Sequence, residues 1–158
     1  MSSHVEKTIE VHLPVHEVYN QWTQFESFPH FMEGVLEVKQ TSDKMTHWKA
    51  QVGPSVKEWD AEIVEQTPDT RIAWRAVNGS PNAGIVSFVP TEKGHTHVTA
   101  QITYDPEGFI EKVGDTLGFM SGRVAGDLER FKKFIEERGQ ATGAWRGEIH
   151  GGQVESKG

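Results

Sequence analysis

Six consecutive runs of strand-like sequence, separated only by turns, constrain the fold of this chain more than any other feature. Apolar and polar residues alternate along each run, which is the period-two pattern of a half-buried strand. The stretches between the runs favour turns, as at Gly53-Pro54 and Lys93-Gly94. Because no helical pattern separates the runs, we expect an antiparallel meander. The expected strands span residues 35–41, 45–52, 57–66, 71–78, 83–90 and 95–104.

The expected sheet has one large apolar face. Its opposite face carries charged residues such as Lys49, Asp60, Glu62 and Arg75, and is therefore expected to contact water. Following the alternation, the apolar face carries Trp48, Ala50, Val52, Trp59, Ala61, Ile63, Ile72, Trp74, Ala76, Val86, Phe88, Val98, Ala100, Ile102 and Tyr104.

A long helix is expected after the meander, over residues 106–139. Its apolar residues recur every three or four positions and so share one helix face. They are Val113, Leu117, Met120, Val124, Leu128, Phe131 and Ile135. A second series, Gly114, Gly118, Gly122 and Gly126, would cost roughly 1 kcal/mol per residue relative to alanine. Close packing against the sheet, space for a ligand and bending of the helix are three explanations for these glycines.

The chain before the meander predicts a strand and two short helices. Residues 5–13 alternate as a strand does, and Pro14 suits the first turn of a helix that continues to Trp22. A second short helix is expected over residues 26–33, before Gly34. After Gly139 the sequence is glycine-rich and loses its periodicity. We therefore expect one domain over residues 1–139 and a flexible tail over residues 140–158.

Composition excludes several classes of function. The net charge of −7 argues against nucleic acid or an anionic membrane as partner, since both require a basic surface. The absence of cysteine excludes disulfides, thiolate catalysis and cysteine-ligated metal centres. No apolar run is long enough for an integral membrane segment, and no signal region precedes the first strand, so a cytoplasmic protein is expected. We expect no cofactor, and a homodimer stays open as the oligomeric state.

Dispersed residues carry a resemblance over about residues 4–139. They are Ile9, Val11, Pro14, Val18, Tyr19 and Trp22, then Phe28, Pro29, Phe31, Met32, Gly34 and Val35, then Trp59, Ala61, Ile63, Pro68, Ile72, Trp74, Val86 and Phe88, with a helix over residues 108–138. The sequence resembles the START-like (SRPBCC) superfamily, and within it the polyketide cyclase/dehydrase and lipid-transport branch that includes the coenzyme Q-binding proteins. The resemblance implies an α+β helix-grip fold. In this fold a curved antiparallel seven-stranded sheet surrounds a long C-terminal helix, with two short helices after the first strand.

The resemblance also implies a cavity between sheet and helix that takes a lipid, quinone, sterol or polyketide. Inward aromatic residues of the sheet would line it, although any one of them could simply fill the core. Phe28 and Phe31 would lie at its mouth with Met32, either as a gate or as an ordinary hydrophobic cap. A buried Tyr104 hydroxyl would need a partner. The expected ligand-binding residues are Phe28, Phe31, Met32, Trp48, Trp59, Trp74, Phe88, Tyr104, Leu117 and Met120.

No catalytic or metal-binding constellation is evident from spacing. Cyclisation of a polyketone needs a base and donors for an enolate, but Asp60 and Glu62 are expected on the wet face. Of the expected polar groups, Arg71, Arg75, Ser87, Tyr104 and Arg123 show no paired partner. His95-x-His97 could place two imidazoles on one strand face, yet no third ligand accompanies them, so we predict a surface pair. Pro14 separates His12 from His16, and no metal site is predicted.

Three hypotheses for the function follow. The first is binding and transport of a hydrophobic small molecule in the cavity. The second is an aromatase/cyclase-type enzyme acting on a polyketide chain, for which no catalytic residue is assigned. The third is a purely structural cavity, with the function on a surface that binds a partner.

Overall fold

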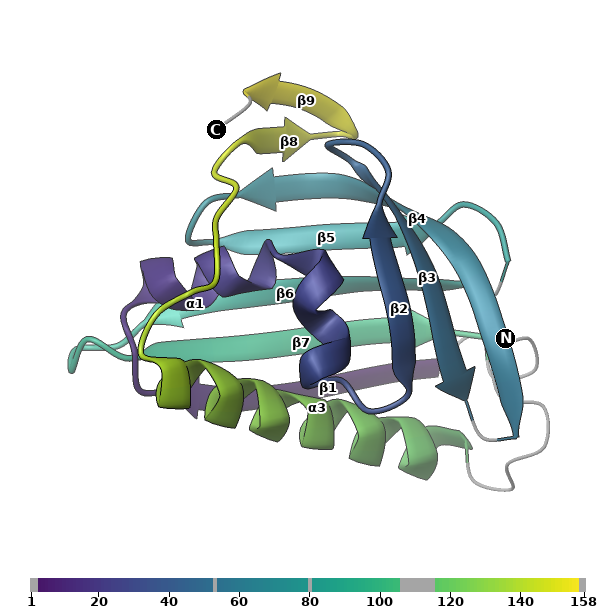
Figure 1. Ribbon diagram of the computed structural model, residues 1–158, viewed down its shortest axis with the longest axis horizontal. Helices are drawn as coiled ribbons and strands as arrows, with labels where there is room; N and C mark the ends of the chain where they lie inside the picture. Colours follow the sequence, from purple (N-terminus) through teal and green to yellow (C-terminus); the bar gives the residue numbers. More distant parts are fainter. Residues whose placement is uncertain (1–2, 53, 80, 106–115, 157–158) are drawn as a thin grey trace.

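A single antiparallel sheet dominates the computed structural model, which describes residues 3–52, 54–79, 81–105 and 116–156. Within these residues the sheet has nine strands, with β1, β7, β6, β5, β4, β3 and β2 side by side in that order and β8 and β9 attached beside β4 (Figure 1). The strands are β1 (Ser3–Val11), β2 (Val35–Gln40), β3 (Met45–Val52), β4 (Ser55–Thr67), β5 (Arg71–Ala76), β6 (Asn82–Pro90), β7 (Thr96–Tyr104), β8 (Glu148–His150) and β9 (Gln153–Ser156). The predicted α+β fold is confirmed, with two strands more than expected.

Three helical segments lie on one side of this sheet (Figure 1). They are α1 (Val15–Trp22), the 3-10 helix η1 (Phe25–His30) and the long α3 (Thr116–Arg138). Pro14 occupies the N-cap position of α1, one residue before the first turn in which it was expected. The second short helix is tighter and ends earlier than predicted, because Pro29 lies inside it and cannot donate a backbone hydrogen bond. The expected first part of the long helix, residues 106–115, lies outside the described residues.

The sheet bends around α3, which runs beside β1 (Figure 1). β4 is the longest strand, and its pairing with β5 shifts register between Ile63 and Glu65. Such an irregularity adds an unpaired residue and bends the strand. The apolar face therefore curves toward the helix and does not form a flat layer. Apolar residues on this face pack with the helices as the core, while the opposite face carries the charged residues.

The glycine series on the long helix does not bring α3 close to the sheet at the two positions that can be assessed. A Cβ built on Gly122 would have no neighbour within 4 Å, and Gly122 is exposed. The three atoms nearest to a Cβ on Gly126 all belong to the guanidinium of Arg130, from the same helix. Close packing against the sheet is therefore the wrong explanation for Gly122, and the sheet does not supply the nearest neighbours of Gly126. Gly114 lies outside the described residues.

The C-terminal residues differ from the flexible tail that we expected. β8 pairs with the end of β4, where Ile149 lies opposite Gln66, and the Ile149 side chain is 0 % exposed. Gly151 and Gly152, which the sequence suggested as flexible, have φ angles of 57° and 78° and form the two-residue turn between β8 and β9. Such a turn needs positive φ at both positions, so glycine here specifies a hairpin.

The segment between α3 and β8 is also held against the domain. Arg146 Nη1 donates to Asn20 Oδ1 at 2.6 Å, and its Nη2 pairs with Asp69 at 2.8 Å. Trp145 N donates to Thr23 Oγ1 at 3.1 Å. These contacts tie the end of the chain to α1 and to the turn between β4 and β5. In the described part of the chain, no helix combines the length and hydrophobicity that a membrane span requires.

Candidate functional site

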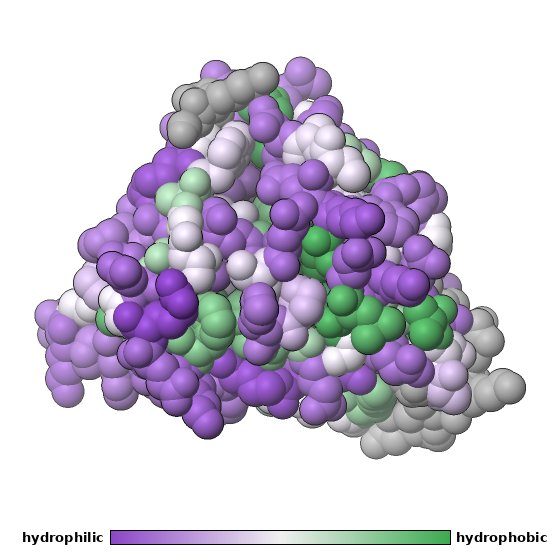
Figure 2. Space-filling view, viewed as in Figure 1, coloured by the Kyte–Doolittle hydropathy of each residue, from purple (hydrophilic) through white to green (hydrophobic). Residues whose placement is uncertain are grey.

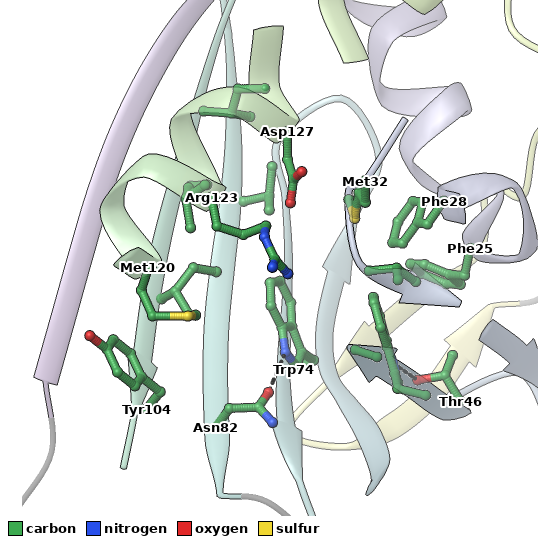
Figure 3. A pocket seen from close by; sticks show the side chains of 18 of the residues that line it. Phe25, Phe28, Met32, Thr46, Trp74, Asn82, Tyr104, Met120, Arg123 and Asp127 are labelled. Carbon is green, nitrogen blue, oxygen red and sulfur yellow. Dashed lines mark hydrogen bonds between the residues drawn. The ribbon is translucent and has the colours of Figure 1, made fainter. Parts of the chain in front are cut away.

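A cavity of about 160 Å³ lies between the sheet, η1 and α3 (Figure 3). One buried water needs only about 10–15 Å³ of comparable space, so the side chains leave a gap many times larger than a packing defect. Of the ten residues expected to bind a ligand, those that line this cavity are Phe28, Met32, Trp48, Trp59, Trp74, Tyr104 and Met120.

The other three expected residues do not contribute described side chains to the cavity lining. Phe31 is buried against Trp22 and Phe131, with ring centroids 6.4 and 5.2 Å away. Phe88 is buried against Tyr19 with ring centroids 5.4 Å apart. Both residues fill the core beside the cavity, as the alternative explanation allowed. Leu117 belongs to α3, but its side chain lies outside the described residues.

Aromatic rings form much of the cavity wall. Trp48 and Trp59 are directly opposite on β3 and β4, and their rings stack with centroids 5.8 Å apart and planes 8° from parallel. Phe28 from η1 lies 5.6 Å from the Trp48 ring. Trp48 Nε1 donates to Thr46 Oγ1 at 2.9 Å, which fixes the indole and satisfies its polar edge. The wall is consequently apolar and held in one orientation.

Trp74 depends on a small neighbour and a polar partner. Gly84 lies opposite it on β6, and a Cβ there would fall 2.5 Å from Cη2 of Trp74 and 3.0 Å from Cδ1 of Ile102. The indole therefore occupies the space that a side chain at position 84 would take. Its Nε1 donates to Asn82 Oδ1 at 3.3 Å (Figure 3). These two neighbours set how far the Trp74 ring extends into the cavity.

The cavity has a charged side, formed by Arg123 and Asp127 of α3 (Figure 3). Asp127 Oδ1 accepts from the backbone N–H of Glu33 at 2.9 Å and from Nη2 of Arg130 at 2.5 Å. The Asp127 side chain is only 17 % exposed, and this burial raises the pKa of its carboxyl above the usual value, against the opposing effect of both hydrogen bonds. A carboxyl of this kind can accept or deliver a proton nearer neutral pH.

Arg123 connects α3 to the far wall of the cavity. Its Nη1 donates to the carbonyl oxygen of Gln51 in β3 at 3.3 Å, and its guanidinium carbon lies 4.9 Å above the Phe119 ring. Gly34, with φ of 84°, is adjacent: a Cβ there would overlap the Arg123 guanidinium. Glycine at this turn thus permits both the backbone conformation and the path of the arginine.

Sequence reasoning named Arg123 as an available polar group and missed Asp127. The signal was present: Asp127 follows Met120 by seven residues, which is close to two helical turns, so both point in nearly the same direction. A charged residue beside an apolar stripe normally faces solvent, so the sequence alone does not place Asp127 at the cavity.

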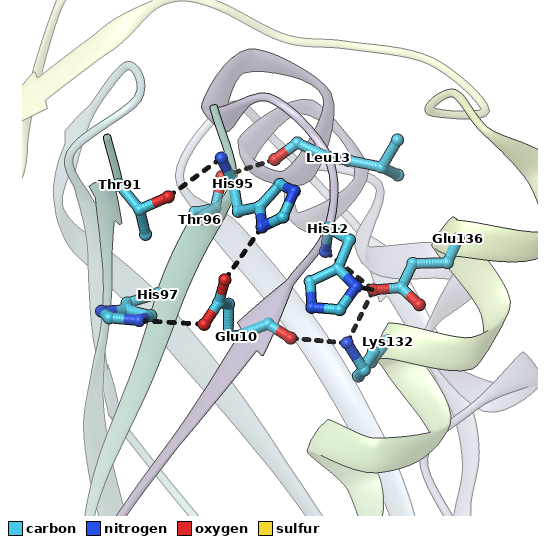
Figure 4. Close-up of polar contacts among 9 residues, drawn as sticks. All are labelled: Glu10, His12, Leu13, Thr91, His95, Thr96, His97, Lys132 and Glu136. Atoms are coloured by element: carbon cyan, nitrogen blue, oxygen red, sulfur yellow. Dashed lines mark hydrogen bonds and ion pairs between the residues drawn. The ribbon is translucent and has the colours of Figure 1, made fainter. Parts of the chain in front are cut away.

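The structure also corrects the expectation that His95 and His97 have no third group beside them. Glu10 of β1 accepts from Nδ1 of His95 at 2.9 Å and lies 3.5 Å from Nε2 of His97 (Figure 4). The His12 ring packs against the His95 ring, with ring centroids 4.5 Å apart and planes tilted by 31°. Sequence spacing could not show this, because the groups come from strands that are 85 residues apart.

Comparison with known proteins places these features in context. Residues 11–133 match the model of a family described as polyketide cyclase/dehydrase and lipid transport. An uncharacterised 17.2 kDa protein of Streptomyces lincolnensis is 55 % identical over 148 residues, which are 93 % of this chain and 99 % of that protein.

Solved structures show the same fold. An aromatase/cyclase from a Streptomyces species aligns with a TM-score of 0.70 and 13 % identity, over 91 % of this chain and 99 % of that one. A START superfamily protein from Mycobacterium smegmatis aligns with a TM-score of 0.66 and 14 % identity, over 85 % of this chain and 95 % of that one. At these identities the likeness concerns the fold alone.

Proposed function

Because this chain belongs to the polyketide cyclase/dehydrase and lipid-transport family, we propose that it binds and carries a mainly apolar small molecule with one polar end. The observation that carries this proposal is the cavity of about 160 Å³ between the sheet and α3. Side chains of a well-packed core would have filled this space, and an unfilled apolar gap costs stability. A guest that occupies the gap recovers the lost contacts.

The lining suggests the chemistry of the guest. The stacked Trp48 and Trp59 rings and the Trp74 ring offer broad apolar surfaces, which suit a flat or isoprenoid body such as a quinone, lipid or polyketide-like chain. Arg123 offers a fixed cation to a carbonyl, carboxylate or similar oxygen at one side of the cavity. A mainly apolar chamber with its charged groups on one side suits a carrier, because the guest must also leave.

Binding is tested with a probe that combines these properties, 1-anilinonaphthalene-8-sulfonate, whose fluorescence rises in apolar surroundings. We expect saturable binding to the purified protein, accompanied by a change in tryptophan fluorescence, since four tryptophans, Trp22, Trp48, Trp59 and Trp74, line the cavity. Ala100 of β7 lines the cavity and is buried, so Ala100→Phe places a ring in the space meant for the guest. This substitution should weaken probe binding by at least about tenfold, at an overpacking cost of about 1–3 kcal/mol in stability.

Val89→Phe on β6 is the matched control, because Val89 is largely exposed and does not line the cavity. It should bind the probe as the wild-type protein does. Equal binding by Ala100→Phe and the wild type, with both folded by circular dichroism, would refute the cavity as the binding site. Native mass spectrometry of the freshly purified protein adds the identity of any lipid or quinone that accompanies it.

One observation favours an aromatase/cyclase as the second candidate. Asp127, with its raised pKa, and Arg123 both line the cavity, so a base and a cation are available to one bound polyketone. The carboxylate would remove a proton alpha to a carbonyl, and the guanidinium would stabilise the enolate oxygen.

A model poly-β-ketone separates the two candidates. A cyclase would convert it, and Asp127→Asn or Tyr104→Phe would abolish the conversion while leaving binding intact. Binding without conversion by the wild-type protein supports the carrier. Conversion that depends on Asp127 would refute the carrier proposal and support the aromatase/cyclase proposal.

A further inference from the structure

A second cluster of chemically active side chains lies at the β1 edge of the sheet, and none of its residues lines the cavity. The antiparallel register of β1 and β7 places Glu10 opposite His97 and Val11 opposite Thr96. His12 directly follows β1 and His95 directly precedes β7. Glu10 contacts both His95 and His97, and the His12 ring lies against the His95 ring. Three imidazoles and one carboxylate consequently meet at the end of these two strands (Figure 4).

The distances within this cluster suit a single small ion. One ligand atom from each of Glu10, His12 and His95 can be chosen so that all three lie within 4.8 Å of one another. Ligands of a tetrahedral zinc ion are roughly 3.3 Å apart, given bond lengths of about 2.0–2.1 Å. All three side chains have room to close this difference by changes of rotamer, because His12 is exposed and the other two are half-buried.

The backbone beneath the cluster is fixed. Thr96 Oγ1 donates to the carbonyl oxygen of Leu13 at 2.9 Å, which joins the end of β1 to the start of β7. His95 N donates to Thr91 Oγ1 at 3.1 Å, which holds the turn before β7 (Figure 4). A ligand set on a backbone that is already positioned loses little entropy when the ion binds.

From this arrangement we propose a surface site for a divalent transition-metal ion, with Glu10, His12 and His95 as ligands and His97 beside them as a further imidazole. Imidazole and carboxylate favour zinc and its neighbours in the first transition row over magnesium or calcium, which prefer oxygen ligands. The ion would take the place of the Nδ1 proton that His95 donates to Glu10, and the neutral imidazole would keep its one ring proton on Nε2. The ion would then link β1, which lies beside α3, to β7.

Lys132 of α3 is the nearby cation that such a site must accommodate. Its Nζ donates to the backbone oxygen of Glu10 at 2.7 Å and to Oε2 of Glu136 at 2.8 Å. The same Glu136 oxygen lies 4.0 Å from Nδ1 of His12. Glu136 thus neutralises Lys132 and places further negative charge beside the imidazole, so the lysine does not oppose an incoming cation.

Isothermal titration of the chelator-treated protein with ZnCl₂ tests this site, with MgCl₂ as the comparison ion. We expect one saturable zinc site and no magnesium binding. His95→Gln and His12→Gln should each weaken zinc binding by at least about tenfold. The matched control is His4→Gln: His4 lies on β1, faces the same side, and has a single carboxylate, Glu6, at 3.9 Å. This control should bind zinc as the wild type does.

Imidazole NMR spectra of the wild-type protein provide a readout that needs no variant. Added zinc should shift the ring signals of His12 and His95 and leave those of His30 and His150 unchanged. The proposal is overturned if zinc produces no saturable heat, if both cluster variants bind as tightly as the wild type, or if the shifted signals belong to histidines outside the cluster. None of these outcomes depends on the apolar cavity, so this test is independent of the proposed carrier function.

Discussion

Replacement of Ile149 by alanine tests whether the C-terminal strands are part of the folded domain. The Ile149 side chain is 0 % exposed and lies over the core, opposite Gln66 of β4. Ile149→Ala removes three buried carbon atoms, worth about 2.5 kcal/mol at roughly 0.8 kcal/mol each. The cavity left behind adds to this value, and the total should fall at about 3–4 kcal/mol.

Urea unfolding followed by circular dichroism measures this loss. With a slope of about 2 kcal/mol per molar urea, the midpoint should fall by roughly 1.5–2 M. The control is Val56→Ala on β4, where the side chain is 49 % exposed, and its effect should stay below about 1 kcal/mol. A loss below about 1 kcal/mol in Ile149→Ala would refute the docking of β8, as would rapid cleavage of the native wild-type protein by trypsin after Arg146.

Two further predictions concern aromatic side chains. Burial raises the pKa of the Tyr19 hydroxyl from 10.0 to about 12. The folded state therefore keeps this proton to a higher pH than the unfolded chain does. This difference contributes about 3 kcal/mol to stability below pH 10, and the contribution should be lost as the pH rises towards 12. Urea unfolding at pH 9 and 11.5 should show a smaller loss in Tyr19→Phe, and an equal loss would contradict this reasoning. Gly84→Ala should displace the Trp74 indole, lower the free energy of unfolding by about 1–3 kcal/mol and shift the tryptophan emission. Unchanged emission and stability would show that the indole has more room than its contacts with Gly84 indicate.

Alternation along the strands was sufficient to predict the sheet and one wall of the cavity. Residues 45–52 were predicted as a strand and form β3, and Trp48, Trp59 and Trp74 all reach the cavity. The same face assignment could not tell where the cavity ends. Phe88 shares the apolar face, but it meets Tyr19 of α1 and fills the core. The position of a helix across a sheet decides this, and a strand pattern carries no information about it.

Three features were not predictable for different physical reasons. β8 and β9 have three and four residues, too few for a period to be recognised. The Glu10–His95 contact joins positions 85 residues apart and depends on the register of two strands. The burial of Asp127 depends on a hydrogen bond from the backbone of Glu33, which is distant in sequence, and on Arg130 of the same helix.

The short C-terminal hairpin also has a consequence for solubility. β3 pairs with β4 only as far as Glu62, beyond which the main chain of β4 would present unsatisfied donors and acceptors at the rim of the sheet. β8 covers that stretch at Glu65 and Gln66, and Gly152 N donates to the Val64 carbonyl oxygen at 2.9 Å. On the face viewed in Figure 2, apolar residues gather on the side where β2 to β4 lie, within a surface that is otherwise mostly hydrophilic. A chain shortened to Gly139 would expose this unpaired edge of β4 on a molecule that also carries an apolar surface. That combination favours aggregation through edge-to-edge strand pairing.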